Sequence, residues 1–234
     1  MPLYNGTLFQ IDKQEVMRYA KLNPKNPEFP ADVIDDAIRK ALSLAEPRGI
    51  WQILPYSPDE GRILGKHPFL LQGHSIRQHL SGAHFVGVLA VTAGDKIEQA
   101  SSENFREGKY LEGLLLDAAA TAAVEALADQ IDSLIRDQAR RAGQKTVWRF
   151  SPGYGDWPVT QQNDFAALIG AKEIGITVTD HSMLLPRKSV TAVIGISGCG
   201  RKPLHNKCSA CSLTTCPFRE TDISHQGGSH HDTI

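Results

Sequence analysis

The segment from Trp148 to Pro158 (WRFSPGYGDWP) concentrates residue types that bind small molecules. Arg149 carries a planar guanidinium that can hold a carboxylate through two parallel hydrogen bonds. Tyr154 offers an aromatic face for stacking or for contact with a cation, and the glycines on either side of it let the backbone approach a flat ligand closely. Because the segment follows a predicted strand and is bounded by proline, we predict a ligand-binding loop, with a structural turn as the alternative.

Glu125 is the second residue whose surroundings suggest chemistry. It is the only charged residue between Asp117 and Asp129, in a helical stretch made otherwise of alanine, threonine, valine and leucine. A carboxylate buried in such a surface needs a cationic partner. The alternative is that Glu125 points to solvent from the side of its helix.

The four cysteines, Cys199, Cys208, Cys211 and Cys216, lie within 18 residues, and the first 198 residues contain none. Such a local cluster cannot cross-link a large domain as a disulfide framework does. Four thiolates suit tetrahedral zinc and an iron–sulfur cluster equally well, and His205 could replace Cys199 as a ligand. The third alternative is a segment that binds no metal.

Two glycine-rich segments do not support a nucleotide-binding fold. GRILGK (61–66) has one residue too few between its glycines for a phosphate-binding loop, and His67 stands where serine or threonine belongs. GISGCGRK (195–202) follows a predicted strand, but Pro203 and the lack of apolar periodicity argue against the helix that a Rossmann site requires. We interpret both segments as turns.

The composition indicates a soluble globular protein. The 234 residues are 41% apolar and carry a formal net charge of −1, which removes the general attraction that drives most nucleic-acid binding. No apolar run approaches the ~18 residues of a membrane-spanning helix. The N-terminus lacks a basic region followed by an apolar stretch, so we expect no signal peptide, no membrane contact and a cytoplasmic location.

Helices and strands that must position these residues are mixed along the chain. Apolar spacing predicts helices at 32–45, 75–82, 96–108, 110–142 and 160–168, and strands at 49–56, 84–93, 146–150, 173–180 and 189–197. The longest helix has one stripe of residues expected to be buried: Leu116, Ala120, Val124, Leu127, Ile131 and Ile135. Without strict β-α-β alternation, the pattern predicts a single α+β or mixed α/β domain.

Three segments together resemble the activation domain of cobalamin-dependent methionine synthase: DAAATAAVEALADQI (117–131), RFSPGYGDWPVTQQ (149–162) and SMLLPRKSVTAVIGIS (182–197). The likeness is strongest to stand-alone proteins built on that domain, and it covers roughly residues 30–200. It implies an α+β fold, a single curved domain with a mainly antiparallel sheet and long helices. We therefore expect this domain at 1–198, a Cys-rich metal-binding segment at 199–219 and a disordered tail at 220–234.

The resemblance also implies a function in methionine biosynthesis. In that family the domain binds S-adenosylmethionine (AdoMet) and supports reductive reactivation of a corrinoid methyltransferase, in which inactive cob(II)alamin is reduced to cob(I)alamin and remethylated. Carried onto this sequence, Arg149 would hold the ligand's carboxylate and Glu125 its ammonium. Backbone groups around Ser151 and Gly153 would meet the adenine, and Tyr154 would face the corrin. Because cob(I)alamin is itself a strong nucleophile, we assign no catalytic residue; the protein would be accessory to, or part of, methyltransferase activity.

The partners follow from what the chain lacks. It has no Asp-x-His-x-x-Gly cobalamin signature, so cobalamin must come on a partner, either a methionine synthase lacking its activation domain or another corrinoid protein. Ile194 stands about where the family has a tyrosine in the last strand. A flavodoxin or ferredoxin would donate the electron. This need, and the proline after Cys216, favour iron–sulfur over zinc. Two alternatives remain: an iron–sulfur electron-transfer protein that does not use AdoMet, and a non-catalytic docking protein with a zinc-bound tail.

Overall fold

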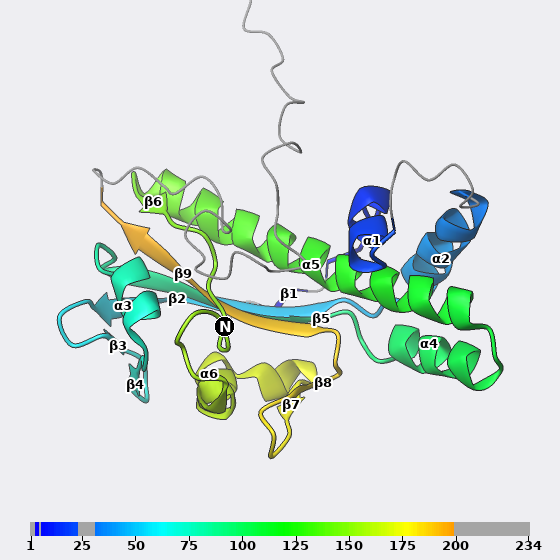
Figure 1. Ribbon diagram of the computed structural model, residues 1–234. Helices are drawn as coiled ribbons and strands as arrows, with labels where there is room; N and C mark the ends of the chain where they lie inside the picture. Colours follow the sequence, from blue (N-terminus) through cyan, green and yellow to red (C-terminus); the bar gives the residue numbers. More distant parts are fainter. Residues whose placement is uncertain (1–2, 5, 23–30, 199–234) are drawn as a thin grey trace, which may run out of the picture.

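The computed structural model describes residues 3–4, 6–22 and 31–198 (Figure 1). Within these ranges the helices are α1 Lys13–Tyr19, α2 Ala31–Leu44, α3 His74–His79, α4 Lys96–Arg106, α5 Tyr110–Arg141 and α6 Gln162–Ile169, with short 3₁₀ turns η1 Val159–Gln161 and η2 Ala171–Ile174. The strands are β1 Leu3–Tyr4, β2 Arg48–Ser57, β3 Arg62–Ile63, β4 Phe69–Leu70, β5 Phe85–Thr92, β6 Lys145–Thr146, β7 Thr177–Val178, β8 Leu184–Leu185 and β9 Ser189–Ser197.

An antiparallel sheet forms the centre of the molecule. Its strand order is β4-β3-β2-β5-β9-β6, and β1 pairs with the start of β2. β5 is paired along its whole length with β2 on one side and β9 on the other, without interruption of the register. β7 and β8 form a separate two-stranded ribbon. The mixed fold with a mainly antiparallel sheet, expected from the sequence, is confirmed.

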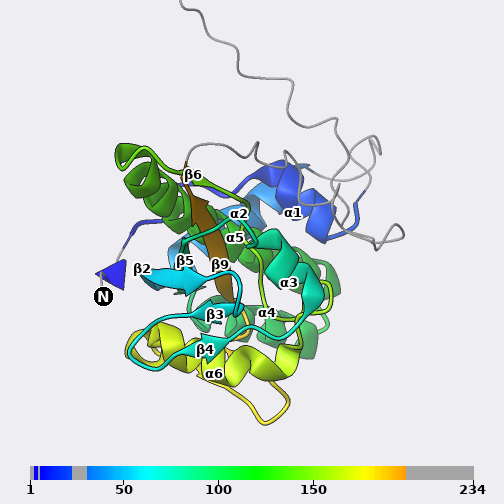
Figure 2. The same cartoon turned by 90° about the vertical axis from the view of Figure 1, so that its left-hand side faces the viewer.

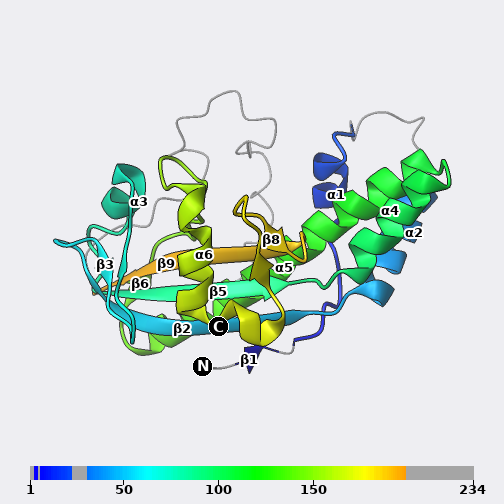
Figure 3. The ribbon, with the colours of Figure 1, turned by 90° about the horizontal axis from the view of Figure 1, so that it is seen from below.

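Helices cover both faces of this sheet. α5 crosses one face, with α1, α2 and α4 packed against it, and α6 lies on the opposite face (Figures 1 and 2). Seen from that opposite side, α6 and the β7–β8 ribbon lie across β5 and β9 (Figure 3). Every residue of β5 after Phe85 is buried, as expected for a strand covered on both faces.

The long helix confirms the predicted apolar stripe, because all six residues of the stripe are buried against the sheet and the neighbouring helices. Alanines fill much of this interface, and their small side chains allow the helix to lie close to its neighbours. The packing of α5 thereby fixes the position of Glu125 next to the edge of the sheet. No helix in the described part of the chain is long and apolar enough to cross a membrane.

Two strand predictions are wrong in extent. Residues 171–174 form η2 rather than strand, and only Thr177–Val178 of the predicted strand at 173–180 pairs. Gly175 has φ +78°, a left-handed conformation that interrupts an extended strand. The predicted strand at 146–150 pairs as β6 at its start and through one bridge from Phe150 to Val193 at its end.

Candidate functional site

A cleft of about 200 Å³ lies where α5, α6 and β9 meet at one edge of the sheet. Four separate stretches of the chain supply its walls: α5, the loop after β6, the first residue of α6, and the last two strands. The residues that line it are Glu125, Arg149, Ser151, Pro152, Tyr154, Gln162, Leu184, Ser189, Val190 and Thr191. A second cavity beside His79 has about 20 Å³, which is room for about one water molecule.

The cleft exists because β9 loses its neighbour halfway along its edge. The segment after β6 follows β9, with the Val147 N–H donating to the Gly195 carbonyl at 3.0 Å. Phe150 then exchanges two hydrogen bonds of 2.8 Å with Val193. Beyond Phe150 the chain turns away from the strand, so the first residues of β9 border the cleft instead of another strand.

The loop after Phe150 is a compact turn. The Tyr154 N–H donates to the Ser151 carbonyl at 3.0 Å, and the Gly153 N–H donates to the Trp157 carbonyl at 2.9 Å. Gly153 has φ +92°, which a residue with a Cβ rarely adopts. Tyr154, at the outer end of this turn, is 52% exposed. The loop therefore presents one aromatic ring to solvent at the border of the cleft.

Two anchors hold the loop to the rest of the protein. Trp157 is buried, and its indole Nε1–H donates to the Gln161 amide oxygen at 2.8 Å. The Asp156 carboxylate accepts hydrogen bonds from the backbone N–H groups of Ser75 and His74 at the start of α3. These N–H groups lower the pKa of Asp156, the one from Ser75 most. Trp157 and Asp156 thus fix the loop in place, Trp157 through Gln161 and Asp156 through the start of α3.

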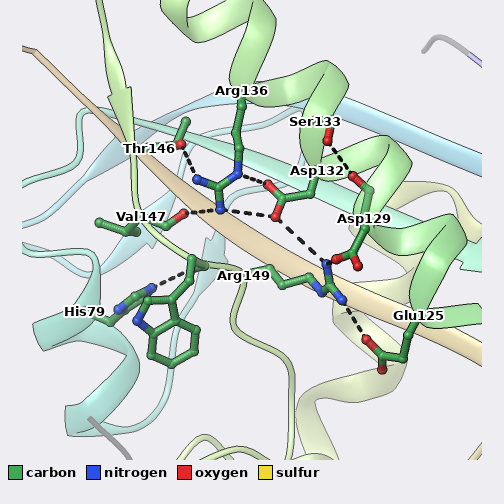
Figure 4. Close-up of polar contacts among 10 residues, drawn as sticks. His79, Glu125, Asp129, Asp132, Ser133, Arg136, Thr146, Val147 and Arg149 are labelled. Carbon is green, nitrogen blue, oxygen red and sulfur yellow. Dashed lines mark hydrogen bonds and ion pairs between the residues drawn. The ribbon is translucent and has the colours of Figure 1, made fainter. Parts of the chain in front are cut away.

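Arg149 is the most buried charged group of the cleft, with 5% of its side chain exposed. Its Nη2 donates to the Glu125 carboxylate at 2.6 Å, and its Nη1 donates to Asp129, one helical turn further along α5 (Figure 4). Asp132 lies 3.9 Å from Nη1. Burial alone would lower the pKa of Arg149, but attraction by Asp129 and Glu125 outweighs it and the net shift is upward, so the guanidinium stays charged.

A second arginine ties α5 to the segment that leads to Arg149. Arg136 binds the Asp132 carboxylate through Nε at 2.7 Å and Nη2 at 3.1 Å, and its Nη1 donates to the Thr146 hydroxyl at 3.0 Å (Figure 4). Asp132 therefore stands between the two arginines. The pair Asp132–Arg136 adds no net charge, whereas Arg149 with Glu125 and Asp129 carries a net charge of −1.

The structure brings together most of the residues that the sequence suggested. Glu125, Arg149, Ser151 and Tyr154 line the same cleft, although Glu125 and Arg149 are 24 positions apart. Gly153 shapes the loop but does not line the cleft. Glu125 does not point freely to solvent, because it pairs with Arg149. Ile194 is fully buried in the core on the α5 side and is not a wall of the cleft.

The predicted metal segment lies outside the described residues. Cys199, Cys208, Cys211 and Cys216 all belong to 199–234, as do the predicted segments at 199–219 and 220–234. Within the part of the chain that the structure describes, no three His, Cys, Asp or Glu side chains are grouped to hold a metal ion.

Sequence reasoning missed half of the cleft. Gln162 opens α6, and Ser189 and Thr191 belong to β9. The signal that could have found Thr191 is a polar side chain inside an otherwise apolar strand, SVTAVIGIS. The sequence contains no signal for Gln162, because two neighbouring polar residues, here Gln161 and Gln162, at the start of a helix are common on protein surfaces. Asp129, too, was not predicted as a partner of Arg149.

Fold and site define a class: an α+β domain with an antiparallel sheet, helices on both faces, and a charged cleft at the sheet edge. Residues 71–198 match the family described as "Vitamin B12 dependent methionine synthase, activation domain". The match spans more than half of the chain, and it includes the Arg149 loop and all of α5. The protein belongs to this family, and the resemblance inferred from the sequence is confirmed.

A solved structure agrees at the level of the fold. The crystal structure of the MetH reactivation domain bound to AdoHcy superposes with a TM-score of 0.59 at 17% identity, over 86% of this chain and 79% of that one. At this identity the likeness concerns the fold alone. A comparison with curated protein sequences finds no match.

Proposed function

We propose that this protein binds AdoMet in the cleft and supports remethylation of a corrinoid carried by a partner protein. The observation that carries the proposal is the meeting of Glu125 and Arg149 in one cleft at 2.6 Å. A ligand with a free amino-acid end needs a cation for its carboxylate and an anion for its ammonium, side by side. Membership of the activation-domain family and the AdoHcy-bound structural relative support the same ligand class.

Arg149 keeps donors for such a ligand. A guanidinium has five N–H donors, and within the described residues its hydrogen bonds go only to Glu125 and Asp129. A ligand carboxylate can use the remaining donors while Asp129 stays in place. Glu125, which is 31% exposed, is free on its solvent side to accept from an ammonium. Arg149 would thereby orient the amino-acid end of the ligand.

The charge of the cleft suits AdoMet. At neutral pH AdoMet carries a carboxylate, an ammonium and a sulfonium, so its net charge is +1. The group formed by Arg149, Glu125 and Asp129 has a net charge of −1. Opposite net charges favour binding most strongly in a partly buried site, where water screens them less. A cleft of this composition is expected to bind the positively charged sulfonium compound more tightly than AdoHcy, which is neutral.

The residues of this chain need only bind and orient. The partner's reduced corrinoid would supply the nucleophile that takes the methyl group from sulfur, and AdoHcy would leave. Holding the methyl group in line for that attack is a positioning task, and neither Glu125 nor Arg149 has to transfer a proton. Tyr154, exposed at the border of the cleft, is placed to contact the partner. The electron donor, a flavodoxin or ferredoxin, and the cytoplasmic location remain predictions.

The decisive experiment uses the full chain with a methionine synthase that lacks its own activation domain and is loaded with cob(II)alamin. With AdoMet and a low-potential reductant, the absorbance of methylcobalamin should grow, and AdoHcy in place of AdoMet should abolish the growth. No growth with AdoMet would contradict the proposal. The iron–sulfur electron-transfer and zinc docking alternatives rest on the cysteine segment, and metal analysis of the same sample distinguishes them.

A further inference from the structure

Gln162 and Thr191 form a buried polar pair on the wall of the cleft. Gln162 is 5% exposed and Thr191 2%. The Gln162 Nε2 donates to the Thr191 hydroxyl oxygen at 2.7 Å. The pair comes from two elements, the first turn of α6 and the third residue of β9, so that each side chain fixes the rotamer of the other. Neither residue has a role in the proposal above.

The pair leaves hydrogen-bonding capacity unused. Within the described residues the Gln162 Oε1 accepts no hydrogen bond. In the described part of the chain, the buried side-chain atoms that lack both a partner and solvent contact are Arg48 Nε, Tyr56 OH, Arg62 Nε and Trp148 Nε1. Gln162 Oε1 is not among them, so solvent in the cleft reaches it. The second hydrogen of the Gln162 amide and the Thr191 hydroxyl hydrogen also remain to be donated.

The backbone beside the pair is unpaired as well. The Lys188 and Ile196 carbonyls accept from Ala93 and His84 at the two ends of β5, so even-numbered residues of β9 bond toward β5. Val193, an odd-numbered residue, bonds in the opposite direction, to Phe150. By the alternation of an antiparallel ladder, the N–H and C=O of Thr191 therefore point away from β5 and toward the cleft. No backbone partner meets them there in the described part of the chain.

In the described part of the chain only solvent in the cleft can meet the free groups of this wall. Methionine or leucine would fill the place of Gln162 without needing any polar partner, so the amide is better suited to a ligand than to packing. The amide presents an acceptor and a donor next to each other. A vicinal diol is complementary to it, because each hydroxyl can donate to the amide oxygen or accept from the amide N–H. Nucleosides carry such a diol on the ribose.

We propose that Gln162 and Thr191 form the subsite that binds the ribose hydroxyls of the ligand. The inference rests on the proposed function, which puts the amino-acid end of AdoMet at Arg149, and on the expectation from the family resemblance that its adenine meets backbone groups around Ser151 and Gly153. The ribose lies between these two ends of the molecule. Gln162 makes the direct contact and is a specificity-determining residue, while Thr191 holds the amide in the orientation that the diol requires.

Calorimetry with AdoHcy and its 2′-deoxy and 3′-deoxy analogues tests the subsite on the full chain. Gln162→Met keeps the length of the side chain and removes the amide. We expect it to weaken AdoHcy binding about tenfold, the effect of losing one buried hydrogen bond and leaving its partner unpaired. At least one deoxy analogue should bind wild type about tenfold more weakly than AdoHcy does, and Gln162→Met should bind that analogue and AdoHcy alike.

Two further variants keep the test interpretable. Asn163→Ala changes the neighbouring exposed residue of α6 and should leave all affinities unchanged. Thr191→Val preserves the branched shape of the strand residue, and should weaken AdoHcy severalfold while thermal unfolding shows a folded protein. If both deoxy analogues bind wild type as tightly as AdoHcy, the subsite is refuted and the proposed function stands. If neither AdoMet nor AdoHcy binds wild type, the proposed function fails, and this inference falls with it.

Discussion

Glu125 and Asp129 hold the same guanidinium from successive turns of α5, but only Glu125 lines the cleft. Glu125→Gln and Asp129→Asn therefore make the same chemical change on the two sides of Arg149. Glu125→Gln should remove a charge-assisted hydrogen bond to the ligand's ammonium, a loss of about 1.5–3 kcal/mol or about 10- to 150-fold in AdoMet affinity. Asp129 is 67% exposed, so Asp129→Asn should change the affinity by no more than about threefold.

Folding stability should respond differently from binding. Each single substitution leaves the buried Arg149 with one full carboxylate, so we expect each to lower the free energy of unfolding by only about 1 kcal/mol. The double substitution leaves Asp132 at 3.9 Å as the nearest anion, and that carboxylate already binds Arg136. A buried cation without its own partner is destabilising by about 3–5 kcal/mol, and the double variant should approach that loss.

Calorimetric titration with AdoMet and urea unfolding of the four proteins measure both quantities. The AdoMet affinity should differ between the two single variants, whereas their free energies of unfolding should not. Equal losses of affinity for Glu125→Gln and Asp129→Asn would refute the assignment of Glu125 to the ligand's ammonium. A stability loss in the double variant no larger than in the single variants would show that Arg149 does not depend on these carboxylates.

Three other predictions concern the loop arginine, a histidine and the cysteines. Arg149→Ala should weaken AdoMet binding by about 1.5–3 kcal/mol, and Arg149→Lys, which keeps the charge but not the planar fork, should weaken it while staying folded; unchanged affinity in calorimetry would show that Arg149 does not hold the carboxylate. Burial lowers the pKa of His79, whose Nε2–H donates to the Trp148 carbonyl at 2.8 Å, so the unfolded chain binds the proton more readily. The contribution of neutral His79 to stability should be complete above the ordinary pKa of 6.5 and should fall as the pH drops below that value. In urea unfolding, the stability of His79→Asn should therefore depend less on pH in this range than that of wild type. Protein purified without oxygen should contain iron and absorb visible light, and Cys208→Ser should lose both; a colourless protein with one zinc per chain would contradict the cluster.

Local sequence signals predicted the elements that position the site. The apolar stripe of α5 and the strand at 189–197 were predicted with nearly the bounds that the structure shows. Both signals are periodic over many residues, and burial of the apolar face is what selects helix or strand. The segment 173–180 also alternates apolar residues, and Ile174 and Ile176 are indeed buried. Its backbone nevertheless turns at Gly175. The alternation of this segment therefore predicted its buried residues correctly, but it predicted the extent of its strand pairing wrongly.

The candidate site was predictable in its residue types and not in its contacts. The aromatic and glycine content of the loop and the isolation of Glu125 pointed to Arg149, Tyr154 and Glu125, and the family resemblance added Ser151; all four line one cleft. Nothing in the spacing of charges on α5 shows that Asp129 shares Arg149, because an exposed aspartate on a helix is ordinary. Which carboxylates pair with Arg149 depends on where the segment after β6 passes α5.

By itself, the sequence determined the family, the long helices and strands of the core, and the loop that carries Arg149, since each is encoded by residues close together in the chain. Only the tertiary structure decided which groups meet. The departure of the chain from β9 after Phe150 opens the edge of the sheet, and the packing of α5 and α6 on opposite faces brings Glu125 and Gln162 to that edge. The cleft is a product of three-dimensional packing because its walls come from segments far apart in sequence, and their apposition depends on the free energy of the whole core.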